Sequence, residues 1–184
     1  MDATRYFTDY FDGISKKISS VDNNLLERSA QIIQNAHERG GKLIFVGNGG
    51  SAAMASHLSV DFTKTAGVRA INFNEADLIT CFANDYGYEH WVAKALEAYA
   101  DAQDVVVLIS SSGRSPNILN GAIQARHMGM STITVSGFDA DNPLRGLGDV
   151  NLWVNSTAYN VVEMAHHVWL LAISDYIIAA SASA

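Results

Sequence analysis

The sequence predicts an α/β fold: a three-layer sandwich with a parallel, doubly wound sheet, preceded by two N-terminal helices. Short apolar runs rich in β-branched residues, which are typical of buried parallel strands, lie at 42–47, 105–110, 131–136 and 150–154. Helical patterns lie between these runs, and alternation of this kind is typical of parallel strands joined by helices. Two more helical patterns come before the first strand.

The first 40 residues carry the two leading helices. Aromatic and aliphatic side chains recur every three or four residues from Tyr6 to Val21, which is the stripe of an amphipathic helix. A second helical pattern runs from about Asn23 to Gly40, where a glycine with positive φ can close the helix. Because such a stripe needs a partner surface, we expect residues 1–40 to be used in oligomerisation.

The later helices are expected at 51–64, 88–100, 116–127 and 159–178. The last contains an apolar stretch from Val161 to Ala180, but this stretch carries acidic residues and two histidines. We therefore interpret it as a buried helix and expect no membrane span. Residues 179–184 are only Ala and Ser, and we predict a flexible tail there.

Composition narrows the class of protein. The chain has 184 residues, of which 48% are hydrophobic and 17% charged, and we expect residues 1–184 to form a single globular domain. A net charge of -7 without any basic run argues against direct nucleic-acid binding. The single cysteine, Cys81, excludes an intramolecular disulfide, and the N-terminus has no apolar signal core, so we expect a cytoplasmic protein.

The loop after the first strand is rich in glycine. In open α/β sheets ligands bind at the carboxyl ends of the strands, where Asn48, Gly49, Gly50 and Ser51 follow Gly47. Backbone N–H groups can approach an anion closely there, so we predict an anion-binding loop. A ligand-free tight turn is the alternative. The loop also fits a dinucleotide fingerprint, but no convincing acidic residue follows about 20 residues later, and we expect no nucleotide cofactor.

The loop after the second long strand is more specific. It contains Ser110, Ser111, Ser112 and Ser115, and it leads into the N-terminus of a helix. Hydroxyl and backbone N–H donors together with the helix dipole can bind a phosphate monoester. Helix capping is the alternative, but capping uses one hydroxyl, so the additional serines favour a phosphate site.

The sequence resembles the SIS-domain (sugar-isomerase) family and, within it, the phosphoheptose isomerases. The resemblance covers nearly the whole chain and is carried by 47–52, His57 with Asp61, 83–89 and 110–117. It implies an isomerase that interconverts sedoheptulose 7-phosphate and D-glycero-D-manno-heptose 7-phosphate. It also implies a homotetramer with active sites between subunits.

The resemblance also implies roles for single residues. Ser51, Ser110, Ser111, Ser112 and Ser115 would hold the sugar phosphate. Asp85 would lie near the sugar hydroxyls.

Aldose–ketose isomerisation needs a base for a carbon-bound proton and an acid or a metal for the oxygens. His57 and Asp61 are four residues apart on one expected helix, and Glu163 and His167 repeat this spacing on the last helix. We predict Asp61 as the base, and the four residues together as ligands of a divalent metal such as zinc. An exposed ion pair and buried structural histidines, His166 included, are the alternatives.

The last helix departs from the pattern of the family. Phosphoheptose isomerases usually have glutamate at the position of Asp61, and Gln followed eight residues later by His where this chain has Glu163 and Leu171. We hypothesise that Glu163 and His167 replace that pair, because one helical turn of displacement can keep a side chain on the same face.

Two other functions remain open at this point. The departure favours a non-catalytic SIS protein that binds a replication initiator or another protein. The phosphate loop also fits an isomerase or sensor for a different phosphosugar, because it does not measure the length of the carbon chain. Polar residues on an apolar helix favour the enzyme.

Overall fold

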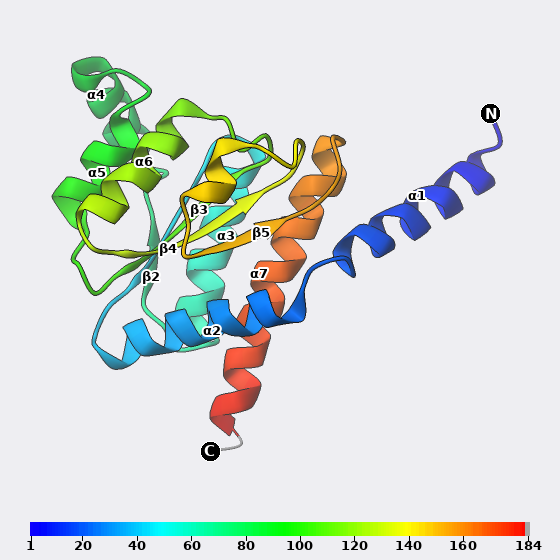
Figure 1. Ribbon diagram of the computed structural model, residues 1–184, viewed down its shortest axis with the longest axis horizontal. Coiled ribbons are helices and arrows are strands. Elements are labelled where there is room, and N and C mark those ends of the chain that lie inside the picture. The colour runs from blue at the N-terminus through cyan, green and yellow to red at the C-terminus, as the bar shows by residue number, and fades with distance from the viewer. Residues whose placement is uncertain (183–184) are drawn as a thin grey trace.

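The computed structural model describes residues 1–182, and in them a parallel sheet lies between two layers of helices (Figure 1). The five strands follow the order β2-β1-β3-β4-β5, and every neighbouring pair is parallel. Their bounds are β1 Leu43–Gly47, β2 Ala70–Asn72, β3 Val105–Ser110, β4 Ser131–Ser136 and β5 Val150–Trp153. The predicted fold class is therefore confirmed.

Helices cover both faces of the sheet (Figure 1). α2, α3 and α7 pack on one face, whereas α5, α6 and the short η1 pack on the other, with α4 beside α5. Their bounds are α1 Ala3–Ile18, α2 Asn23–Glu38, α3 Gly50–Lys64, α4 Ala76–Tyr86, α5 Trp91–Tyr99, α6 Pro116–His127, η1 Pro143–Gly146 and α7 Tyr159–Ala182.

Alternating side chains of the strands supply both cores. Phe45 of β1 points to the α3 side, where its ring lies 5.4 Å from that of Phe62, whereas Ile44 belongs to the opposite core. One fully buried tryptophan anchors each side, Trp169 on α7 and Trp91 on α5. Each such ring contributes a few kcal/mol through burial of apolar area, at about 25 cal/mol per Å².

The strand order places the ligand-binding edge of the sheet. β1 and β3 are neighbours in the sheet. The connection after β1 leads to β2 on one side of this pair, and the connection after β3 leads to β4 on the other side. Loops after two such strands diverge to opposite faces and leave a crevice at their carboxyl ends. In this chain those are the glycine loop after Gly47 and the serine loop after Ser110.

Three elements were missed in the sequence, namely β2, α4 and the short η1. β2 has only three residues, each half-buried, and it is an edge strand that pairs with β1 alone. α4 was missed although Leu78, Ile79 and Phe82 form a short apolar stripe at helical spacing, and these side chains pack partly buried against the core. α7 continues to Ala182, so residues 179–182 of the predicted tail are helical, and 183–184 lie outside the described residues.

α7 is long and apolar enough to cross a membrane by length and composition. Eight of its residues are buried, and it packs against α1, α2 and α3 as well as the sheet. The indole Nε1 of Trp169 donates a hydrogen bond of 2.7 Å to the carbonyl oxygen of Ile18 at the end of α1. We therefore interpret α7 as the core helix of the fold.

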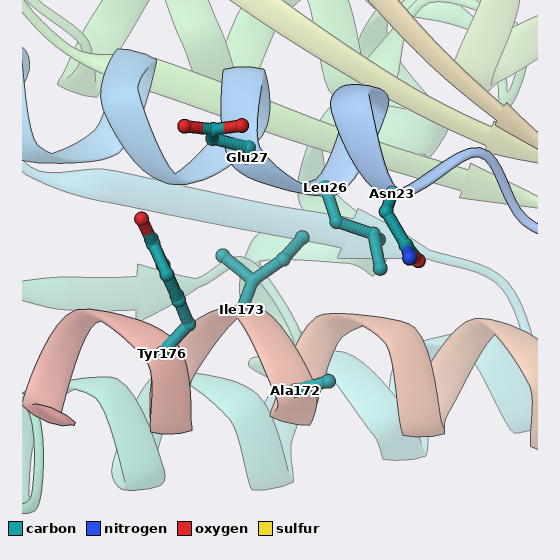
Figure 2. A pocket seen from close by; sticks show the side chains of 6 residues that line it. All are labelled: Asn23, Leu26, Glu27, Ala172, Ile173 and Tyr176. Carbon is teal, nitrogen blue, oxygen red and sulfur yellow. The ribbon is translucent and has the colours of Figure 1, made fainter. Parts of the chain in front are cut away.

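α1 extends away from the rest of the molecule (Figure 1). None of its residues is buried, and its aromatic side chains Tyr6, Phe7 and Phe11 are 50%, 55% and 64% exposed. A mainly apolar groove of about 380 Å³ lies between α7 and α2, the helix that follows α1 in the chain. Figure 2 shows Ile173 and Tyr176 of α7 facing Leu26 and Glu27 of α2 across this groove.

Candidate active site

A pocket of about 190 Å³ opens where the glycine and serine loops meet at the carboxyl ends of β1 and β3. It is lined by Asn48, Ser51, Ile109, Ser110, Ser111, Ser112, Ser115, Tyr159 and Glu163. The structure thus brings the predicted serines of both loops to one place. Ser51, Ser110 and Ser111 are buried, so they line the pocket and have little contact with bulk solvent.

Two helix N-termini point their backbone donors towards this pocket. No side chain within residues 1–182 caps α3, which begins after Gly49 with φ of 56°. Ser115 is the N-cap residue of α6, yet its hydroxyl makes no capping bond and instead lies 3.1 Å from Ser110 Oγ. The serine loop is therefore not explained by helix capping, and uncapped N–H groups favour an anion.

An amide pair joins the two loops. Asn48 Nδ2 donates to Asn117 Oδ1 at 3.0 Å, and Asn117 Nδ2 donates back to Asn48 Oδ1 at 2.9 Å. The hydroxyl of Tyr88 also donates to Asn48 Oδ1, at 3.0 Å. Asn48 therefore fixes the spacing between α3 and α6, and its side chain is already occupied by protein partners.

Apart from Glu163, the polar side chains that line the pocket are neutral. Arg114 follows the serines in sequence, but its guanidinium lies 3.3 Å from Asp139 and 3.6 Å from Asp141. It does not line the pocket. A dianion in this pocket would be held by hydroxyls, backbone N–H groups and helix dipoles.

Glu163 is the one carboxylate that lines the pocket among the described residues. It belongs to the first turns of α7 and lies over the start of α3. A side-chain carbon built on Gly50 would come within 2.8 Å of the Glu163 carboxyl carbon. A side chain at position 50 would therefore displace the Glu163 carboxylate, which lies close to a helix N-terminus that favours negative charge.

His57 and His167 form a pair between α3 and α7. His57 Nδ1 lies 2.9 Å from His167 Nε2, and the two rings are nearly perpendicular at 85°. Burial lowers the pKa of His167, and the nearby His57 lowers it further. His167 is therefore favoured in its neutral form, which can accept a proton.

Asp61 and Asp85 lie outside the pocket lining. Asp61 Oδ2 accepts a hydrogen bond of 3.0 Å from Ser174 Oγ, one turn beyond His57. Asp85 is exposed on α4, where its Oδ1 accepts a 2.9 Å bond from Asn84 Nδ2. Leu171, at the position where the family usually has histidine, packs against the apolar core.

The predicted four-residue metal site does not assemble within one chain. Across residues 1–182 no three His, Cys, Asp or Glu side chains group in a way that could hold a metal ion. His57 and His167 are the two candidate ligands that meet, while Asp61 and Glu163 lie at other levels of the same helix pair. The residues present therefore do not fit a complete site, and a metal would need ligands from elsewhere.

His166 is a structural residue. It is fully buried beside Trp169, and its Nε2 donates to the carbonyl oxygen of Ser136 at 2.9 Å. Burial lowers its pKa to about 4, only partly offset by the bond to Ser136. The alternative of a buried structural histidine holds for this residue.

Sequence reasoning missed Tyr159, which lines the pocket from the first residue of α7. Its only signal was position, since a helix that follows a parallel strand begins at the ligand-binding edge. Tyr88 lies within the 83–89 motif, and its bond to Asn48 could not be inferred from spacing.

A parallel sheet with a serine-lined pocket between two uncapped helix N-termini defines an α/β domain that binds a phosphorylated small molecule. The model of the SIS domain matches residues 6–137. The phosphoheptose isomerase of Helicobacter pylori (strain P12) is 30% identical over 177 residues, covering 93% of this chain and 91% of that protein. The enzyme of the same name from Fusobacterium nucleatum is 34% identical over 145 residues, covering 76% and 74% of the two chains.

The structure agrees with these sequences. Phosphoheptose isomerase GmhA from Neisseria gonorrhoeae superposes with a TM-score of 0.86 at 26% identity, covering 95% of this chain and 96% of that one. The chain belongs to the SIS-domain family, among the phosphoheptose isomerases. The predicted family and the predicted class of enzyme, a sugar-phosphate isomerase, are confirmed, and the non-catalytic alternative is not favoured.

Proposed function

We propose that this protein interconverts sedoheptulose 7-phosphate and D-glycero-D-manno-heptose 7-phosphate. The serine pocket would hold the phosphate, and a proton would move between C1 and C2 through an enediol. The family supports the substrate, because relatives carry the name phosphoheptose isomerase. The pocket supports the phosphate, because hydroxyls and helix N-termini suit a dianion.

The single observation that carries the mechanism is the His57–His167 contact of 2.9 Å. Seven bonds join C2 to phosphorus in an extended heptulose phosphate, which is about 8 Å at roughly 3.4 Å per three bonds. His57 lies six residues after Ser51 on α3, which is a rise of about 9 Å. With the phosphate beside Ser51, C1 and C2 would therefore lie at the level of the two imidazoles.

The imidazole pair would perform the proton transfers. A neutral imidazole removes the proton from C1 of the ketose while the other, protonated, donates to O2, which gives the enediol. Return of a proton to C2 and loss of the proton on O1 give the aldose. The lowered pKa of His167 supports it as the member that accepts the carbon-bound proton. Glu163, inside the pocket, would accept hydrogen bonds from substrate hydroxyls.

Asp61 is a second candidate for the base. It lies ten residues after Ser51, a rise of about 15 Å along α3, which exceeds the reach of a substrate held in the same chain. It would act only if the substrate enters from another copy, as in the predicted tetramer with shared sites. Asp85, exposed on α4, would likewise approach sugar hydroxyls across such an interface.

Zinc remains part of the proposal as an addition to this mechanism. His57 and His167 would be two of its ligands, and a bound zinc ion would polarise the substrate oxygens. The steps above do not depend on it. Activity that is lost with a chelator and restored by zinc would support this part.

Homotetramer formation and a cytoplasmic location complete the proposal. The exposed aromatic face of α1 supports self-association, because apolar side chains of this size are normally covered. Replacing Phe7 and Phe11 together by serine should convert the assembly to smaller species in light scattering. An unchanged mass would contradict the use of residues 1–40 in oligomerisation.

The decisive assay is conversion of sedoheptulose 7-phosphate by the purified full chain, followed by detection of the aldose. His57→Gln and His167→Gln should each lower kcat by 100-fold or more, in line with loss of general acid–base catalysis. Inorganic phosphate should still compete in both variants. His127→Gln, at an exposed position in the last turn of α6, is the matched control.

Asp61→Asn separates the two candidate bases. Activity within about threefold of wild type assigns the proton transfer to the imidazole pair, whereas a loss like that of His57→Gln assigns it to Asp61. Hexose and aminohexose phosphates are tested in parallel, because turnover of these and not of the heptulose would overturn the proposed substrate.

A further inference from the structure

We infer that Tyr159 binds the substrate phosphate through its phenol hydroxyl and that Phe138 is the residue that positions it. This inference rests on the proposed function, because it assigns a further donor to the same pocket.

Phe138 is the one non-glycine residue with positive φ among residues 1–182, at 56°. For an L-residue this conformation costs free energy because Cβ approaches the carbonyl oxygen. Such strain persists only where surrounding contacts impose it, and it concentrates at functional sites. Its location agrees with this, because Phe138 follows Gly137 just past the end of β4.

The contacts that impose the strain tie Phe138 to the serine loop. The N–H of Gly137 donates to the carbonyl oxygen of Ser111 at 2.9 Å. The N–H of Phe138 itself donates to the carbonyl oxygen of Ser156 at 2.9 Å, in the segment that leads into α7. Phe138 therefore links the pocket floor to the start of the helix that carries Tyr159.

The strained backbone directs the Phe138 ring against Tyr159. The ring centroids are 4.9 Å apart with an interplanar angle of 70°, an edge-to-face contact. Phe138 is half-buried and packs on the core, whereas Tyr159 is 60% exposed and lines the pocket. The core thus holds the Phe138 ring in place, and the Phe138 ring holds the Tyr159 ring at the rim of the pocket.

A phosphate in this pocket would be stabilised by a further neutral hydrogen-bond donor such as the Tyr159 hydroxyl. Within residues 1–182 the phenol hydroxyl of Tyr159 has no hydrogen-bond partner, whereas the nearby Arg114 is engaged by two aspartates. Glu163 adds negative charge to the same pocket. A phosphate dianion there lacks a cationic partner and gains from each neutral donor.

The test compares Tyr159→Phe with Tyr176→Phe, a control on the same helix whose phenol is 50% exposed and lines the groove beside α2. A hydrogen bond to a charged group corresponds to about a tenfold change or more. Tyr159→Phe should therefore raise KM for sedoheptulose 7-phosphate and the Kd for inorganic phosphate by about tenfold. The kcat should stay within about twofold, and the control should change neither constant.

Phe138 is tested as a positioning residue by a pair of variants. Phe138→Gly accepts the positive φ but removes the ring, so it should raise KM and the phosphate Kd by about threefold or more while kcat is kept. Phe138→Tyr retains the ring and should restore wild-type constants. If both variants lower kcat and raise KM to the same extent, Phe138 is merely structural and this assignment is overturned.

Calorimetric titration with inorganic phosphate distinguishes failure of the proposed isomerase function from failure of the Tyr159 assignment. If wild type binds phosphate but does not convert the heptulose, the proposed function fails, and the phosphate Kd of Tyr159→Phe still decides this inference. If the heptulose is converted and Tyr159→Phe leaves KM and the phosphate Kd unchanged, this inference fails alone.

Discussion

Gly113 lies in the middle of the serine loop, and its replacement by alanine tests how that loop is held. Its φ is 63°, and a side-chain carbon there would overlap the side chain of Asn142. Asn142 is 2% exposed, and its Nδ2 donates to the carbonyl oxygens of Gly137 at 3.1 Å and Asp139 at 2.8 Å. Its Oδ1 accepts a 3.3 Å bond from the N–H of Arg145.

Gly113→Ala therefore carries two costs. The positive φ costs about 1–2 kcal/mol for an L-residue. Displacing the buried Asn142 side chain would disturb its three hydrogen bonds at about 1 kcal/mol each. We expect the free energy of unfolding to fall by about 4–5 kcal/mol, and phosphate binding to weaken because Ser112 and Ser115 flank the altered position.

Gly129→Ala is the matched control, because its φ is 72° but nothing lies within 4 Å of the added carbon. It should cost only the backbone term of about 1–2 kcal/mol. Urea denaturation followed by circular dichroism measures both variants. A difference between them below about 1 kcal/mol would refute the reasoning that Asn142 fixes the serine loop.

Three further predictions concern stability and activity. Because the pKa of His166 is lowered to about 4 in the folded state, the free energy of unfolding should be highest above about pH 6.5 and fall by about 3 kcal/mol as the pH drops to 4. His166→Gln should flatten this pH dependence in urea titrations, and an unchanged slope would contradict the prediction. Gly50→Ala should cost less than about 1 kcal/mol of stability, because the flexible Glu163 can move away, but should lower kcat/KM at least tenfold; wild-type turnover would contradict a role for Glu163 in the pocket. Asp104→Ala should lower the free energy of unfolding by about 3 kcal/mol, because it leaves Lys42 and two N–H groups near β1 without their buried acceptor, and a thermal midpoint unchanged by the substitution would rule this out.

Most of the elements that position the site could be predicted locally. β1 and β3 are mainly apolar runs of five and six residues and are fully buried, and such runs are distinct in any sequence. β4 has hydroxyl side chains at four of its six positions, but its β-branched residues still favour a strand. The two pocket loops follow directly from the ends of β1 and β3. β2 was missed because three half-buried residues contain almost no periodic signal, whereas the short apolar stripe of α4 was present in the sequence and was overlooked.

The acid–base constellation was only partly predictable. The spacing of His57 and Asp61 predicted that both lie on one face of α3, and the structure shows that both side chains contact α7. Spacing did not reveal that His57 meets His167 while Asp61 meets Ser174, because the relative depth of two helices depends on how their side chains interlock. The four-ligand set was inferred from residue types, and the helix packing separates its members.

The sequence by itself determined the fold class, the four longer strands and the membership of the family, because each depends on residues that are neighbours along the chain. Tertiary structure alone decided that Arg114 is turned away, that Glu163 lies over Gly50 and that the strained Phe138 holds Tyr159 at the pocket. These contacts join segments that are distant in sequence. Their geometry follows from the packing of helices on the sheet, which local propensity does not encode.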